Sequence, residues 1–190
     1  MLRNLYAPSD FVSTDANPSI PPEAKLDIIA KSPVEVSHSL FGGRVIDEEF
    51  WVSLPFVAGG GFSYGLGGDH ANRLFTDYVN VGDKELYGHR IGSRLLRAAI
   101  RYGVEKEPAV EVFSTGWARL GLVNTTINVL GIENVAFYKG GKRYGWEGDR
   151  PLEQVFDDAP PVENKPYLVY GIEAKIDRDL AMSWERPVST

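Results

Sequence analysis

Residues 74–113 carry the most informative pattern in the chain, LFTDYVNVGDKELYGHRIGSRLLRAAIRYGVEKEPAVEVF. The segment Leu74–Val81 is typical of a strand. A helix is predicted over Ile91–Tyr102, where apolar residues at spacings of four, three and four share one face. Gly103 is expected to end this helix in a left-handed cap, and Ala109–Phe113 to form the next strand. The predicted order is therefore strand, glycine-containing turn, helix, strand.

The turn before this helix suits an anionic ligand. A helix N-terminus presents free backbone N–H groups and a partial positive charge, and glycine lets the backbone come close to a ligand. We expect the N–H groups of Ile91–Ser93 to face a phosphate bound there. The basic row along the same helix is either an ordinary solvated face or a set of phosphate contacts, and it consists of Arg90, Arg94, Arg97 and Arg101.

The rest of the sequence predicts further strands joined by turns. Six glycines in ten residues make Gly59–Gly68 a predicted loop. The stretch Val123–Tyr138 is expected to be helical in part, interrupted by Gly131, and Asp149–Lys165 to be a surface loop. Predicted strands cover Leu26–Ala30, Val34–Leu40, Arg44–Ile46, Phe50–Val57 and Tyr167–Ile176.

These elements predict one α/β (α+β) domain, a mixed, mostly antiparallel twisted sheet flanked by helices. The chain has 190 residues, which is long enough for one domain with a sizeable hydrophobic core. We expect residues 1–24 to be an extended lead-in, residues 25–178 the domain, and residues 179–190 a weakly determined tail.

Composition narrows the classes of function. The net charge of −6 does not indicate a nucleic-acid-coating protein, and the absence of cysteine removes disulfides, thiolate metal sites and a cysteine nucleophile. The three histidines do not stand at ligand spacing, so no metal is expected. Without an apolar run of signal or membrane-span length, the chain is expected to be cytoplasmic and not to enter a membrane.

The segment Tyr87–Leu96, YGHRIGSRLL, resembles the acyl-CoA-binding motif of the GNAT superfamily of N-acyltransferases. That motif has Arg or Gln, two residues, Gly, one residue, Gly or Ala, and then an apolar helix. Tyr87 stands at the Arg/Gln position, Arg90 at the first glycine position and Gly92 at the second. The resemblance implies a GNAT-like fold in which the cofactor contacts Val79, Val81, Gly88, Arg90, Ile91, Gly92, Ser93, Arg94 and Asn124.

A second pair of segments resembles the family's other motif, a helix that begins near Asn, an apolar-Tyr pair and a Gly-aromatic turn. The matching segments are Asn134–Tyr138 and Tyr144–Trp146, and Asn124 is an alternative start for the helix. The resemblance therefore extends from about Leu74 to Trp146, and the usual helix pair after the first strand of the family is not found.

The resemblance implies acetyl-CoA or another acyl-CoA as donor and an amine, in a small molecule or a protein, as acceptor. In the family a tyrosine of the second motif often protonates the leaving thiolate, which maps onto Tyr138; a neutral phenol of pKa about 10 suits that task. The family's base is commonly a carboxylate on the strand before the phosphate turn, which makes Asp77 the candidate. Both residues also have ordinary interpretations, as a half-buried core tyrosine and a strand-edge charge.

Two other functions are compatible with the sequence. Gly61–Gly65 matches the G-x-S-x-G nucleophile elbow around Ser63, and Asp77 or Asp83 with His89 would complete a triad, but the following residues are a poor helix start. The second is a catalytically silent GNAT-like structural or interaction protein, such as a phage virion or assembly component. A homo-oligomer or a larger assembly is also compatible with the sequence. Binding of CoA distinguishes the acyltransferase from such a scaffold.

Overall fold

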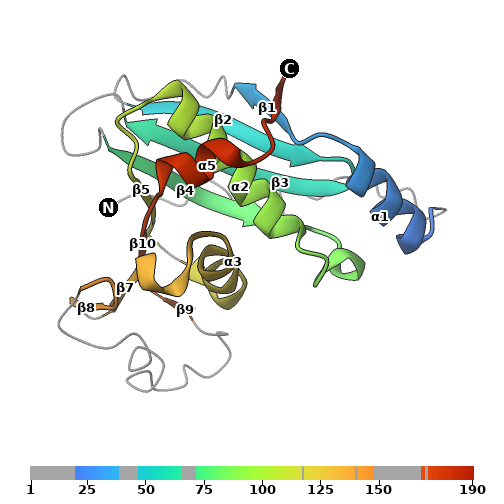
Figure 1. The fold of residues 1–190 in the computed structure, drawn as a ribbon. Coiled ribbons are helices and arrows are strands. Elements are labelled where there is room, and N and C mark those ends of the chain that lie inside the picture. Colours follow the sequence, from blue (N-terminus) through green and yellow to red (C-terminus); the bar gives the residue numbers. More distant parts are fainter. Residues whose placement is uncertain are drawn as a thin grey trace.

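The computed structural model describes residues 20–38, 47–65, 72–116, 118–139, 141–147, 168–169 and 171–190 (Figure 1). In these ranges the chain forms a mixed, open sheet of nine strands with helices packed on it, and a second sheet of two short strands. The strands are β1 (Glu35–His38), β2 (Asp47–Leu54), β3 (Val57–Gly65), β4 (Arg73–Asn80), β5 (Val112–Thr115), β6 (Ala118–Arg119), β7 (Val135–Lys139), β8 (Lys142–Tyr144), β9 (Leu168–Val169), β10 (Ile172–Lys175) and β11 (Val188–Ser189). The helices are α1 (Pro22–Lys31), α2 (Ile91–Lys106), α3 (Leu120–Leu130) and α5 (Arg178–Ser183), with short 3-10 turns η3 (Lys84–Leu86) and η4 (Ile132–Asn134).

The large sheet has the order β11-β1-β2-β3-β4-β5-β10-β7-β8. Strands β1 to β4 form an antiparallel meander. Strand β5 then pairs parallel with β4, and α2 is the connection between them. Strand β10, from the end of the chain, inserts antiparallel between β5 and β7. The predicted α+β class with a mixed, mostly antiparallel sheet and flanking helices is confirmed at this level.

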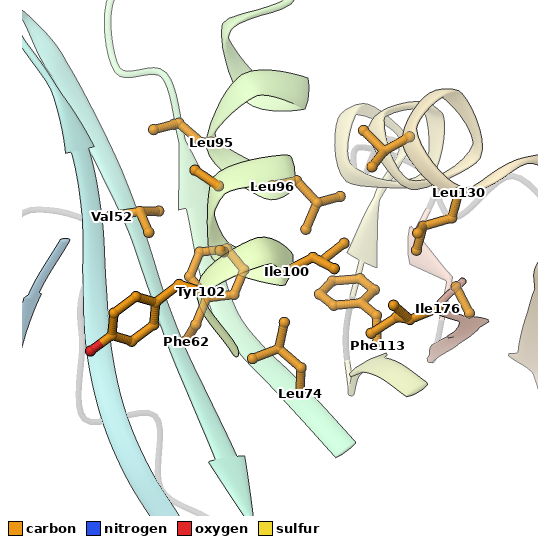
Figure 2. Close-up of a cluster of buried hydrophobic side chains, with 14 of the residues drawn as sticks. Val52, Phe62, Leu74, Leu95, Leu96, Ile100, Tyr102, Phe113, Leu130 and Ile176 are labelled. Carbon is orange, nitrogen blue, oxygen red and sulfur yellow. The ribbon is translucent and has the colours of Figure 1, made fainter. Parts of the chain in front are cut away.

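Helix α2 fills the centre of the core. It lies across β2, β3 and β4, with α5 beside it and α3 next to its other flank (Figure 1). Its apolar face carries Leu95, Leu96 and Ile100, all fully buried, and Figure 2 shows the last two directed toward Phe113 and the α3 side. The helical spacing of apolar residues was thus a correct guide to this element, because one continuous stripe packs on the sheet.

Helix α2 does not end at Gly103, as the sequence analysis expected, but continues to Lys106. A Cβ atom at Gly103 would lie 2.9 Å from Leu74 Cδ1 of β4, and Leu74 is fully buried. The glycine therefore allows the helix to approach the sheet closely and does not act as a cap.

The glycine-rich segment is also different from the expected loop, because Val57–Gly65 is strand β3. The indole of Trp51 on β2 covers two of its glycines: Cβ atoms at Gly59 and Gly61 would lie 2.7 Å from Trp51 Nε1 and 3.2 Å from Trp51 Cζ3. The predicted strand Phe50–Val57 divides at a tight turn, where Phe56 has a positive φ of 61°. Here the glycines accommodate a tryptophan on the neighbouring strand.

Helix α1 replaces the strand predicted over Leu26–Ala30. Pro22 stands at the first helical position, and Lys25 and Ile29, four residues apart, are its buried residues. Lys25 Nζ donates to Asp83 Oδ2 at 2.9 Å, which ties α1 to the turn that precedes α2. Burial of this face, and not the short apolar run, determines the element.

The second half of the chain departs from expectation at two places. Helix α3 ends at Leu130, and Val135–Lys139 is strand β7, so the helix predicted to begin at Asn134 is wrong. The tail forms α5, capped by the Asp177 side chain that accepts from Leu180 N at 3.0 Å, and then β11, which pairs with β1. The predicted strand Arg44–Ile46 and loop Asp149–Lys165 lie outside the described residues.

Candidate functional site

The ladder between strands β4 and β5 is short. Their parallel register covers only three residue pairs, from Arg73↔Val112 to Phe75↔Ser114. Strand β4 nevertheless continues to Asn80, paired with β3 throughout. Strand β5 ends at Thr115, so in the described part of the chain the β4–β5 ladder stops at Phe75 while β4 runs on, and the sheet has an opening on this side of β4.

A bulge lies where the sheet opens. Gly61 of β3 is opposite Tyr78, whereas the next residue, Phe62, is opposite Thr76, so Asp77 is the extra residue on β4. A bulge interrupts the regular ladder and redirects the side chains around it. The backbone thus places the candidate base Asp77 at the mouth of the opening; its side chain lies outside what the structure describes.

The turn before α2 has the conformation of a glycine turn although a non-glycine residue occupies it. Gly88 has φ 85°, and Arg90, the N-cap of α2, has φ 59° and ψ 18°, in the left-handed region. Arg90, which aligns with the first glycine of the motif that this segment resembles, thus has the backbone geometry that glycine favours. No side chain caps the helix at Arg90.

The start of α2 leaves backbone donors available. The first intrahelical bond in this turn is from Arg94 N to Arg90 O, at 3.1 Å, so the N–H groups of Ile91–Ser93 point out of the helix end. His89 and Arg90 are exposed, whereas Ile91 is buried and anchors the turn in the core. This end of α2 lies at the same end of the sheet as the opening, because β4 leads into α2 through the turn.

Helix α3 lies against the first turn of α2. A Cβ atom at Gly92 would stand 3.4 Å from Thr125 Oγ1, so the two helices nearly touch there. Asn124 is exposed on α3, one residue before this contact, and is inside the helix, not at its start. Asn128, one turn later, lines a cavity beside α2 and was not singled out from the sequence.

Tyr138 belongs to a polar network on β7 and β10. Its hydroxyl donates to Glu173 Oε2 at 2.6 Å, and the other carboxylate oxygen of Glu173 is bonded to the Arg73 guanidinium. Burial raises the pKa of Tyr138, and the hydrogen bond to Glu173 and its negative charge raise it further. Burial acts to raise the pKa of Glu173 as well, but the hydrogen bonds from Tyr138 and Arg73 outweigh it, so this pKa lies below its usual range.

This network is on the face of the sheet opposite α2. Leu74, Phe113 and Ala174 are neighbours in register, and Leu74 lies against α2 at Gly103. Because strand side chains alternate between faces, Glu173 and Tyr138 point to the other side. The structure does not bring the hydroxyl of Tyr138 to the start of α2, and Glu173, its partner, was missed because nothing in its local sequence marks it.

The remaining sequence candidates lie on or next to strands β3 and β4. Val79 and Val81 are partly buried against the core at the end of β4 and just after it. Ser63 is inside β3, opposite Glu49 and Phe75, so no strand-turn-helix nucleophile elbow forms around it. Within the described ranges, no group of three or more His, Asp or Glu could hold a metal ion, and no helix is long and apolar enough to cross a membrane.

No protein-family model matches the chain, and no curated protein matches it in sequence.

Proposed function

We propose that this protein is an acyl-CoA-dependent N-acyltransferase with a GNAT-like fold, acting most simply as an acetyltransferase. The observation that carries the proposal is the unit β4–turn–α2–β5, in which the parallel β4–β5 ladder stops at Phe75 and Ser114 and β4 runs on to Asn80, toward the N-terminal end of α2. Elements follow in the order β4, turn, α2, β5, β6, α3, β7, and the part from β4 to β5 has the order strand, turn, helix, strand that was predicted from the sequence.

The residues at this unit fit an acyl-CoA. Three successive N–H groups at Ile91–Ser93 and the positive end of a 16-residue helix favour a pyrophosphate. Gly88 has open space around its Cβ position, and the turn at Arg90 has glycine-like backbone geometry. The opening between β4 and β5 offers strand backbone to an extended, amide-containing chain, which is the character of the pantetheine arm.

The chemistry proposed at this site is a direct transfer. Acyl-CoA would supply the thioester; the amine nitrogen of the acceptor forms the new C–N bond, and the C–S bond breaks. Asp77, at the bulge, would take the proton that the amine loses, and Tyr138 would deliver a proton to the departing thiolate sulfur. The raised pKa of Tyr138 keeps the phenol in its acid form at neutral pH.

One observation favours the alternative of a silent, GNAT-like scaffold. The Tyr138 proton is already donated to Glu173, on the face away from α2. A catalytic Tyr138 therefore has to exchange this bond for one to the sulfur, whereas a structural Tyr138 keeps it.

Calorimetric titration with acetyl-CoA tests binding. We expect micromolar affinity for the native protein and a loss of at least about tenfold for Gly92→Trp, since an indole at this position would cover the N–H groups and strike Thr125. Ile132→Trp is the matched control, because it adds the same ring at an exposed residue of η4. Equal affinity of both variants, or no binding by the folded native protein, would contradict the acyltransferase proposal.

The catalytic assignment needs turnover. With a panel of primary amines and detection of the released thiol, Asp77→Asn and Tyr138→Phe should each lower kcat by about 10²-fold or more. Unchanged kcat in both variants would remove these two residues from the mechanism while leaving the binding result intact.

A further inference from the structure

A cavity of about 690 Å³ lies along the outer side of the first turns of α2. Its walls come from α1, the start of α2, α3 and the segment between α5 and β11. Four arginines and one carboxylate, Glu185, line it, in a protein whose net charge is −6. The cavity therefore collects positive charge against the overall balance, which indicates an anionic ligand.

Two of the four arginines are engaged in holding the fold. Arg94 donates to the carbonyl oxygens of Ile29 and Ser32, each at 2.6 Å, and fastens the end of α1 to α2. Arg94 also forms an ion pair with Glu185, the one acidic residue that lines the cavity, at 3.4 Å from Glu185 Oε2. Arg186 is paired with Glu105. Neither needs a ligand to account for its position.

The other two arginines, Arg90 and Arg97, have no ion pair and no hydrogen bond with the described residues. Arg97 is exposed, and its guanidinium carbon lies 5.8 Å from the centroid of the Trp184 ring. Seven residues separate Arg90 from Arg97, which is close to two turns, so they share one side of α2 about 10 Å apart. This spacing fits a ligand with one anionic group at the start of the helix and a second about two turns along.

We propose that this cavity binds a second phosphate of the donor, the 3′-phosphate on the ribose of CoA, through Arg97, with the indole of Trp184 beside the nucleoside. This inference rests on the proposed function, since the first phosphates are those at Ile91–Ser93. The apolar part of the wall, formed by Leu26, Ile29 and Pro187, is suited to a ring and not to a chain of further charges. Asn128 supplies an amide from α3 at the same cavity.

The test compares CoA with 3′-dephospho-CoA, which differs only in that phosphate. The native protein should bind CoA at least about tenfold more tightly than dephospho-CoA. One charge-assisted hydrogen bond to a phosphate changes a dissociation constant by about this factor. In Arg97→Gln this preference should disappear, with the affinity for dephospho-CoA unchanged. Lys142→Gln, which removes an exposed charge on β8, should keep the full preference.

The outcomes separate the inference from the proposed function. Equal affinity of the native protein for the two ligands, or a preference retained in Arg97→Gln, overturns the cavity assignment while CoA binding stands. Failure of both ligands to bind the folded protein overturns the two proposals together. Urea unfolding of Arg97→Gln in parallel shows that the variant is folded when its affinities are measured.

Discussion

Gly92 of α2 and Thr125 of α3 lie so close that a Cβ atom on the glycine would stand 3.4 Å from the threonine Oγ1. That distance is an ordinary van der Waals contact, so a methyl group fits at this position but a larger side chain does not. Further along the same helix, a Cβ atom at Gly103 would stand 2.9 Å from Leu74 Cδ1, which is an overlap. Two glycines of one helix thus differ in the space they leave.

The same substitution should consequently have opposite effects at these two positions. Gly92→Ala should raise the free energy of unfolding by about 0.5 kcal/mol, because alanine is the better helix former. Gly103→Ala gains the same propensity but has to displace a fully buried leucine, and should lower it by about 1 kcal/mol net. Urea unfolding of both variants measures the difference; equal signs would show that α2 does not pack on β4 as described.

Arg90 is a non-glycine residue in the left-handed region, with φ 59°. Such a residue is strained relative to glycine, so Arg90→Gly should stabilise the protein by up to about 1 kcal/mol. The control is Arg97→Gly, at an ordinary helical position of α2, which should destabilise it by about 1 kcal/mol. Thermal unfolding compares the two; a loss of stability in Arg90→Gly would contradict the assigned turn.

The Tyr138–Glu173–Arg73 network should make stability depend on pH. The pKa of Glu173 is lowered in the folded state, so its contribution is present above the unfolded value of about 4.3 and is lost as the pH falls through the folded pKa. Glu173→Gln should therefore cost about 1–2 kcal/mol at pH 7 and progressively less toward pH 3.

Denaturant unfolding at several pH values measures this dependence, with Glu49→Gln, at an exposed glutamate of β2, as the control for removing a carboxylate. A cost in Glu173→Gln that is the same at pH 7 and pH 3 would show that the carboxylate is not held by Tyr138 and Arg73.

The glycines of β3 offer a prediction with a graded outcome. At Gly59 the backbone φ is 84° and a Cβ atom would collide with the Val52 carbonyl oxygen, whereas at Gly61 the nearest atoms belong to the Trp51 ring, which is able to shift. We expect Gly59→Ala to lower the melting temperature by more than Gly61→Ala. Trp51→Leu should remove most of the cost at Gly61 but only part of the cost at Gly59, where the Val52 carbonyl oxygen and the positive φ remain. Equal costs at both glycines would contradict the described register.

Sequence alone was a good guide where one periodic face meets the core. The strand at 74–81 and the helix starting at Ile91 were predicted correctly because their apolar patterns pack within the central layer. The apolar pattern failed as a guide where the role of a residue depends on a contact with a residue far away in the sequence. No residue near Gly59 and Gly61 in the sequence indicates that Trp51 covers them. Likewise, no residue near Gly103 indicates that Leu74 packs against it.

In the candidate site, too, features made by neighbouring residues could be predicted and contacts between distant residues could not. The turn at Gly88–Ser93 could be predicted because its residues are adjacent in the chain. The partners of Tyr138 could not, since Glu173 and Arg73 come from strands 35 and 65 positions away that only the sheet order brings together. For the same reason, the cavity that contains Arg97 and Trp184 could not be predicted, because only the fold packs the C-terminal tail beside α2.

The most direct test of acyl-CoA binding is an amide shift map of ¹⁵N-labelled protein titrated with acetyl-CoA. The account predicts that the largest changes occur at Gly88–Ser93 and at Thr76–Val81, the turn before α2 and the opened end of β4. A folded spectrum that does not change, or one whose largest changes lie elsewhere, such as along β1 and β2, would contradict it.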